Sequence, residues 1–211
     1  MKHELKRKLV QIAAFGYSNP YLMNYKGGKL YQGKWKQFCN PGLNCYSCPA
    51  ASLACPIGAL QSVNGSMNFA VSFYVTGLLL AFGILLGRAV CGWLCPFGLL
   101  QELLHKIPTP KLKLKKAFLY LKYIVLVVFV LVLPIAVTDY MGMGKPAFCQ
   151  YICPAGTLEG GIPLLLSHGA LRQTIGSLFT LKMSILVITL IGCILVYRFF
   201  CKTLCPLGAI Y

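Results

Sequence analysis

Long uncharged stretches of apolar residues alternate with basic and cysteine-rich connections along this 211-residue chain. The stretch 67–87 carries no charge and is long enough to cross a hydrocarbon core of about 30 Å at about 1.5 Å per helical residue. Two further stretches, 117–138 and 179–197, each contain one lysine near an end, where its ammonium group can reach the lipid headgroups. The pattern predicts a membrane-spanning helix over each of these three stretches.

A fourth span follows from topology. The connection 105–116 holds the densest short run of lysines in the chain, so the positive-inside rule places it in the cytoplasm. If the basic N-terminus is also cytoplasmic, the chain must cross once before residue 67, and the uncharged stretch 9–25 is the only candidate despite its polar residues. We therefore expect an all-α, multi-pass protein of the cell (inner) membrane, with about four transmembrane helices, cysteine-rich loops and both termini in the cytoplasm.

The stretch 160–178 is too interrupted by glycine, proline and polar residues to span a bilayer, and too apolar for a simple loop. It is expected to form an interfacial or re-entrant helix. No low-complexity linker divides the chain, so residues 1–211 are predicted to form a single membrane-embedded domain.

The composition agrees with a membrane protein in contact with lipid, because 57% of the residues are hydrophobic and only 11% are charged, against about 25% in soluble domains. The four acidic residues lie outside the middle of every apolar stretch, which argues against a proton relay or cation pump. The net charge of +16 comes from basic residues that flank the apolar stretches, so nucleic acid is not an expected partner.

Eleven cysteines carry the chemistry, and most of them fall into a repeated pattern. The phrase Cys-x3-Cys-Pro occurs three times, and four cysteines begin a Cys-Pro-x-Gly frame. In bacterial ferredoxins the last two cysteines of the cluster-binding run have the same spacing, so the phrase predicts iron–sulfur ligands and makes electron transfer the leading hypothesis. The three pairs are Cys91 and Cys95, Cys149 and Cys153, and Cys201 and Cys205, and the fourth frame begins at Cys55.

The predicted topology sorts these cysteines by side of the membrane. Four lie together on the cytoplasmic side, and four thiolates are the number that a 4Fe–4S cluster takes. This inner set is Cys91, Cys95, Cys201 and Cys205. The following prolines should stop each helix, and Gly98 and Gly208 should let the backbone turn its N–H groups toward sulfur. The neighbouring side chains Arg88, Arg198 and Lys202 should favour the reduced state of this inner cluster.

Six cysteines remain for the opposite side, which is more than one cluster needs. An outer cluster is expected to draw its ligands from Cys45, Cys48, Cys55, Cys149 and Cys153, with Cys39 as a further candidate. An alternative gives the four cysteines of 39–55 a cluster of their own and leaves Cys149 and Cys153 as a disulfide or as partial ligands. The sequence thus predicts two 4Fe–4S clusters, one near each face. Since a spanning helix covers about 30 Å, either the loops fold inward or a partner's cofactor bridges the gap.

Two other functions compete with electron transfer. The same thiolates could hold Cu(I) or zinc in a metal transporter or sensor. A quinone-linked thiol–disulfide oxidoreductase is the second alternative, since Cys45-x2-Cys48 supplies its spacing, but it leaves the three Cys-x3-Cys-Pro copies unexplained. The sequence has no Ser/His/Asp arrangement or phosphate-binding loop and indicates an electron carrier or redox subunit rather than an enzyme with its own substrate.

With these motifs the chain resembles the membrane-integral 4Fe–4S proteins of the NapH and NosR type, whose signature is paired Cys-x3-Cys-Pro motifs at the ends of transmembrane helices. The resemblance runs from about Cys39 to the C-terminus and is most specific at 91–98 and 201–208. It implies electron exchange among quinol, soluble ferredoxin-type proteins and a reductase subunit. Many such proteins continue into a two-cluster ferredoxin domain, so a sequence ending at Tyr211 implies either a separate ferredoxin partner or part of a longer protein.

Overall fold

Helices dominate the computed structural model, which describes residues 2–65, 73–139, 144–169, 173 and 175–211. Within these residues there is no strand, and extended pairing is limited to two isolated bridges, Cys39 with Ala54 and Thr138 with Gly144. The α-helices are α1 (Lys2–Ser18), α2 (Asn24–Gly27), α3 (Pro56–Asn64), α4 (Phe73–Leu85), α5 (Arg88–Trp93), α6 (Pro96–His105), α7 (Leu121–Val125), α8 (Leu133–Ala136), α9 (Pro154–Gly156), α10 (Ile162–Ser167), α11 (Ser177–Leu195), α12 (Phe199–Thr203) and α13 (Leu207–Ile210). The other helical segments are 3₁₀ turns at Lys34–Gln37 and Lys116–Leu119 and π-helical stretches at Leu126–Val132, Phe148–Ile152 and Thr157–Gly161.

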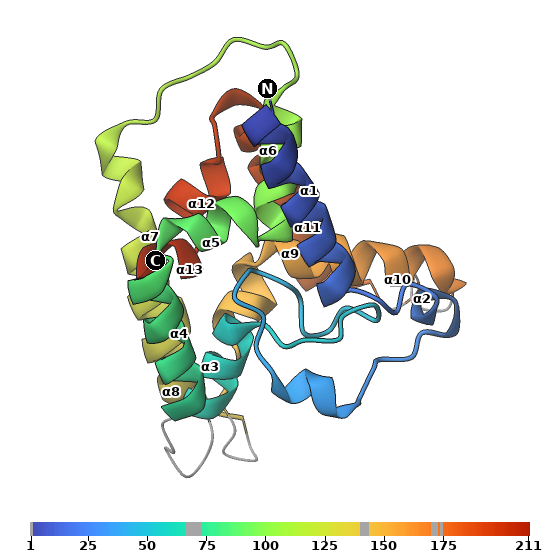
Figure 1. The fold of residues 1–211 in the computed structure, drawn as a ribbon. Coiled ribbons are helices and arrows are strands. Elements are labelled where there is room, and N and C mark those ends of the chain that lie inside the picture. Colours follow the sequence, from blue (N-terminus) through green and yellow to red (C-terminus); the bar gives the residue numbers. More distant parts are fainter. Residues whose placement is uncertain (1, 66–72, 140–143, 170–172, 174) are drawn as a thin grey trace.

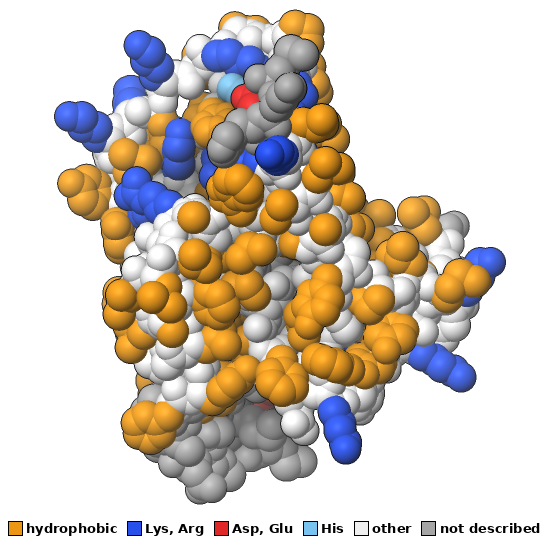
Figure 2. Space-filling model, in the orientation of Figure 1, with side chains coloured by type: hydrophobic (Ala, Val, Ile, Leu, Met, Phe, Trp, Pro, Cys, Tyr) orange, Lys and Arg blue, Asp and Glu red, His pale blue; other side chains and the backbone are white. Residues whose placement is uncertain are grey.

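Two helical segments of the described chain are long and apolar enough to cross a membrane. They are Lys116–Ala136, which contains α7 and α8, and α11. Both coincide with predicted spans, 117–138 and 179–197. Much of their surface is uncovered, as at Ile188, which is 62% exposed. Figure 2 shows apolar side chains over much of the visible face, and an exterior of this kind indicates contact with lipid or another apolar partner.

The predicted span 9–25 is not observed as a membrane-spanning helix. Helix α1 covers Lys2–Ser18 instead, so its first turns carry the basic N-terminal residues, and it ends just before Pro20, which cannot continue the ladder of helical hydrogen bonds. Gln11, in the middle of α1, is fully buried and donates to the Gly92 carbonyl at 2.8 Å. The polar residues of this stretch therefore face protein rather than lipid, and the described chain has two candidate spans instead of the four expected.

The predicted span 67–87 is only partly described. Residues 73–85 form α4, which is apolar but has 13 residues, and the segment 66–72 lies outside the described residues. The chain turns directly after α4 at Gly87, whose φ of +48° is accessible to glycine at little cost. This turn delivers the chain to α5 and the cysteine pair at its end.

Two groups of long helices flank a centre of short ones (Figure 1). Helices α1 and α11 both pack on α6 on one side, and α3 packs on α4 and on the α7–α8 segment on the other. The short helix α12 contacts both groups, and α13 contacts α12, α4 and α7. The cysteine residues therefore meet in the middle of the molecule, where the chain reverses direction several times.

The predicted interfacial helix over 160–178 is shorter than expected. A continuous helical segment runs from Pro154 through α10 to Ser167, and the residues that follow are partly outside the described chain. Leu166, near its end, is 71% exposed. The segment is helical and apolar at its surface, as the pattern predicts, while its position at a membrane interface stays a prediction.

Candidate metal centre

Each Cys-Pro-x-Gly frame aims backbone N–H groups at its own cysteine. Cys55, Cys95 and Cys153 stand directly before α3, α6 and α9 in extended conformation, and the proline is the first helical residue, where no N–H is needed. In the fourth frame the Gly208 N–H donates to Cys205 Sγ at 3.4 Å. The equivalent glycine N–H faces the thiol in the other three frames and opposes the rise that burial causes in its pKa. The frame therefore prepares the sulfur to carry negative charge.

The inner set of four cysteines comes together as the spacing predicts. Cys91 and Cys95 lie in and just after α5, Cys201 and Cys205 lie in and just after α12, and the thiols of the two pairs act on one another electrostatically. In each pair, the glycine that follows the second cysteine lies close to the backbone carbonyl of the first cysteine. A Cβ atom at Gly98 would lie 2.5 Å from the Cys91 carbonyl oxygen, and one at Gly208 would lie 2.7 Å from that of Cys201.

Four of the outer cysteines, Cys45, Cys55, Cys149 and Cys153, form a second set. The glycine of each frame faces a cysteine of the other segment. An ideal Cβ at Gly156 would lie 3.5 Å from Cys45 Sγ, and one at Gly58 would lie 3.8 Å from Cys149 Sγ. The first loop (39–55) and the second loop (the segment 144–156) are thus assembled around one centre.

The other two outer candidates, Cys48 and Cys39, lie beside this set rather than in it. Cys48 Sγ lies 2.9 Å from the Tyr25 hydroxyl, and its side chain packs in a small cluster with Ala50 and Ala51, against which Cys45 also packs. Cys39 is close to Cys55, pairs with Ala54 through an isolated bridge, and lines the same cavity as the outer set. All eleven cysteines are free, so the alternative of an outer disulfide is not observed.

A cavity of about 560 Å³ opens beside the outer set and is lined by all four of its cysteines, together with Lys36 and Lys182. A zinc ion would need its sulfur ligands about 2.3 Å from one point, and no three His, Cys, Asp or Glu side chains of the described residues are arranged around a single ion. A 4Fe–4S cluster takes its four thiolates on four different irons. The arrangement of the thiolate donors and the cavity beside them therefore fit a 4Fe–4S cluster better than a single metal ion.

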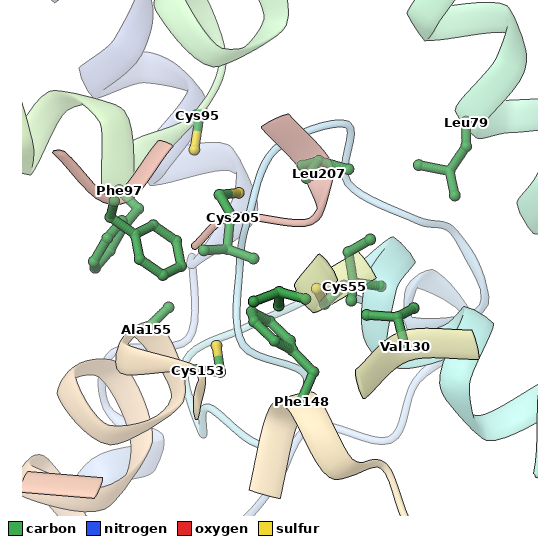
Figure 3. Packing of buried hydrophobic residues seen from close by; sticks show 14 of the residues in the cluster. Cys55, Leu79, Cys95, Phe97, Val130, Phe148, Cys153, Ala155, Cys205 and Leu207 are labelled. Atoms are coloured by element: carbon green, nitrogen blue, oxygen red, sulfur yellow. The ribbon is translucent and has the colours of Figure 1, made fainter. Parts of the chain in front are cut away.

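The inner and outer sets share one buried core. The backbone N–H of Leu43 faces the Cys95 thiol of the inner set, and that of the next residue, Asn44, faces the Cys55 thiol of the outer set. Because Leu43 and Asn44 are consecutive residues and the N–H group of each contacts one of the two sulfurs, the sulfurs lie within about 12 Å of each other. Figure 3 shows two cysteines of each set within the same packing. Of the two possibilities that a span of about 30 Å leaves open, the described residues agree with the first, in which the loop folds inward.

Burial raises the pKa of these thiols, to about 11 for Cys91 and to about 12 for Cys45 and Cys149. Neighbouring thiols add to the rise at Cys91 and Cys149, and at Cys45 the carboxylate of Glu159 is the largest electrostatic contribution. Free thiols here would stay protonated, and bound iron would have to displace their protons. A thiol–disulfide enzyme needs the opposite, a lowered pKa at its attacking cysteine, so the raised pKa of Cys45 disfavours the oxidoreductase alternative.

Positive charge surrounds the inner set. Arg198, Lys122 and Arg88 all act on Cys91, which confirms the position of two of the three basic residues expected there. The third, Lys202, instead extends over the ring of Tyr197 at 5.4 Å. The outer set has charges of both signs, since Glu159 Oε2 accepts the Cys45 N–H at 2.9 Å and Lys182 Nζ donates to the Cys149 carbonyl at 3.3 Å.

Two polar side chains that contact the sulfurs are not predicted from the sequence. Gln101 donates to Cys201 Sγ at 3.0 Å, and Gln61 donates to Cys149 Sγ at 3.3 Å. A single glutamine matches no metal-binding motif, so neither residue is visible to motif reasoning. Comparison of the four Cys-Pro-x-Gly frames with one another would find them, because both occupy the same position in their frames.

These features agree with the comparisons with known proteins. The chain belongs to the 4Fe-4S binding domain family, whose model matches residues 67–115, 123–170 and 178–211, more than half of the chain. All three Cys-x3-Cys-Pro pairs fall inside the matched segments. Cys45 and Cys55 fall outside them, so their place in the outer set rests on the structure.

Three relatives match parts of the chain. Two are uncharacterised proteins of Methanocaldococcus jannaschii: MJ0750 is 32% identical over 136 residues, which cover 60% of this chain and 48% of the relative, and MJ0749 is 33% identical over 109 residues, 40% and 44%. The third is protein NirI of Paracoccus denitrificans, 32% identical over 140 residues, 61% of this chain and 18% of NirI. The chain therefore spans about half the length of the first two relatives and less of NirI. No solved structure matches.

Proposed function

We propose that this protein is a membrane-embedded electron carrier that holds two 4Fe–4S clusters and passes single electrons between a quinol or soluble ferredoxin-type donor and a reductase subunit. Assignment to the NapH and NosR type is part of this proposal. The supporting observation is the adjacency of the two cysteine sets, where the N–H groups of the consecutive residues Leu43 and Asn44 reach one sulfur of each. Metal storage or sensing would not need two four-thiol sets so close together.

The residues of the chain suit such a carrier in three ways. Two sets of four thiolates hold the clusters, and a bound 4Fe–4S cluster supplies reversible one-electron chemistry whose potential depends on charge, hydrogen bonds and exposure. Burial of Cys55, Cys95, Cys153 and Cys205 keeps water from the ligands. The apolar exterior and two candidate spans keep the molecule in lipid.

The charges around the two sets differ, and this difference gives the proposal a direction. Three cations act on Cys91 of the inner set, whereas the outer set has one cation beside Cys149, Lys182, and a buried carboxyl group, Glu159, beside Cys45. Positive charge near a cluster stabilises its additional electron. The inner cluster should therefore have the higher potential, which favours electron flow from the outer set to the inner set.

Anaerobic purification from detergent-extracted membranes tests the proposal. The protein should contain about eight iron and about eight acid-labile sulfide per chain, and a reductive titration followed by EPR should show two signals, with the inner cluster reduced first. A colourless protein with zinc or copper would support the transporter or sensor alternative. Recovery of about four iron, with the chain fully folded, would contradict the two-cluster proposal.

A further inference from the structure

Each Cys-Pro-x-Gly frame has a polar or titratable residue six positions after its cysteine, and the side chain of this residue contacts another segment of the chain. The four frames begin at Cys55, Cys95, Cys153 and Cys205, and their sixth residues are Gln61, Gln101, Glu159 and Tyr211. Each stands about one and a half helical turns beyond its proline, on the side of the helix that faces the cysteines. The inner set and the outer set each contain two of these frames, so all four frames have such a residue.

Gln101 makes the tightest of these contacts. Its side chain is fully buried, and its Nε2 donates to Cys201 Sγ at 3.0 Å. Its Oε1 accepts the backbone N–H of the same cysteine at 3.4 Å and faces the Cys193 thiol at 3.6 Å. Because the carbonyl end of the amide is occupied by two donors, the NH₂ end must face the sulfur.

Gln61 repeats this arrangement in the outer set. It is also fully buried, and its Nε2 donates to Cys149 Sγ at 3.3 Å. Its Oε1 accepts the backbone N–H of Phe148, the residue before that cysteine, at 3.0 Å. In both sets the glutamine of one Cys-Pro-x-Gly frame thus reaches the first cysteine of the facing Cys-x3-Cys-Pro pair.

The other two sixth residues are tied to the first loop. Glu159 Oε2 accepts the Cys45 N–H at 2.9 Å, and the Tyr211 hydroxyl donates to the Pro41 carbonyl at 3.1 Å. Neither side chain donates to a sulfur. Each set therefore contains one sulfur-directed amide donor, and it comes from the first frame of the set in both cases.

We infer that Gln61 and Gln101 are matched positioning residues that each tune one cluster through a side-chain N–H···S hydrogen bond. The inference rests on the proposed function, since it assigns a role toward the clusters. Reduction increases the negative charge on the ligand sulfurs, and a donor held against one of them stabilises the reduced state and raises the potential. In a buried site, the effect of one such bond is not diluted by water.

A purely structural role is the competing explanation. Both amides also donate to the carbonyl one helical turn back, Ile57 O at 3.3 Å for Gln61 and Phe97 O at 3.4 Å for Gln101. A structural amide would affect stability and cluster occupancy, and would leave the potential of an assembled cluster unchanged. The potential therefore separates the two explanations.

The test uses Gln61→Met and Gln101→Met in the full chain, because methionine keeps the unbranched shape and removes the donor. EPR-monitored titration should show a lower midpoint potential for the outer cluster in Gln61→Met and for the inner cluster in Gln101→Met, with the other cluster unchanged in each. Gln11→Met is the matched control, since Gln11 is equally buried beside the inner set but donates to the Gly92 carbonyl. It should move neither potential.

A second measurement needs no variant. In wild-type protein labelled with ¹⁵N at the glutamine side-chain amide, pulsed EPR should detect a ¹⁵N coupling at each cluster. Signals of normal iron content that show neither a shifted potential in the variants nor a ¹⁵N coupling would overturn the inference and leave the proposed function intact. Absence of cluster signals from wild-type protein would instead overturn the proposed function.

Discussion

At the scale of residues, neighbouring cysteines in the first loop have different surroundings. Cys45 reaches Gly156 of the second loop, whereas Cys48, three residues later, faces the Tyr25 hydroxyl. That hydroxyl also donates to the Glu159 carbonyl at 2.6 Å, so Tyr25 and Cys48 join the first loop to the helical segment after α9. Burial and the neighbouring thiol raise the pKa of Tyr25, which keeps the hydroxyl protonated as a donor.

Single substitutions should distinguish a cysteine that binds a cluster from a cysteine that only packs against its neighbours. Cys55→Ala is expected to remove the outer cluster and about four of the eight irons, because three thiolates cannot complete the site. Cys48→Ala should keep full iron content and both EPR signals, at a cost in thermal stability only. Iron analysis and EPR of the two purified variants check this, and loss of the outer signal from Cys48→Ala would show that the outer ligand set is drawn wrongly.

The inner set could be predicted from the sequence because its four cysteines come from two frames of identical spacing. The outer set could not be reduced to four ligands in the same way. Cys45-x2-Cys48 has ferredoxin-like spacing, yet Cys45 pairs across space with Cys55 and the second loop. Spacing along the chain reports contacts within a helix or turn, and the first loop has little regular structure to make spacing informative.

At the scale of elements, one buried carboxylate joins three parts of the helical framework. Glu102 on α6 accepts from Arg7 of α1 at 2.6 Å, and from Arg198 Nε, between α11 and α12, at 3.0 Å. The Tyr197 hydroxyl also donates to it at 3.1 Å. The carboxylate side chain is 5% exposed, so α1 is held by an ion network as well as by apolar packing.

Neutralising this carboxylate should loosen α1. In Glu102→Gln two arginines would lose their buried partner, and breaking a buried ion pair costs about 3–5 kcal/mol. The melting temperature in detergent should fall clearly, and protease should cut the N-terminal segment faster. Glu4→Gln, at an exposed position of the same helix, is the control and should change stability by less than about 0.5 kcal/mol. Equal melting temperatures for the two variants would contradict the role assigned to Glu102.

At the scale of the whole molecule, hydropathy predicts two long helices whose surfaces are largely uncovered by protein, Lys116–Ala136 and α11. It fails for 9–25, because an uncharged stretch looks alike whether its polar residues face lipid or a buried protein partner such as the Gly92 carbonyl. It also says nothing about loops, and the path of 39–55 into the core depends on contacts far apart in sequence. The distance between the two cysteine sets is therefore set by the fold and cannot be predicted from the pattern of apolar and polar residues.

The same distance gives the most direct test of the architecture. Clusters whose ligand sulfurs approach within about 12 Å should interact magnetically when both are reduced, so the EPR spectrum of fully reduced protein should be broadened or split and should relax fast. Cys55→Ala, which keeps only the inner cluster, should give a narrow, slowly relaxing signal. Clusters on opposite faces, about 30 Å apart, would interact far more weakly, and the fully reduced spectrum would then be close to the sum of two independent signals. Such a sum would show that the first loop does not bring Cys55 beside Cys95.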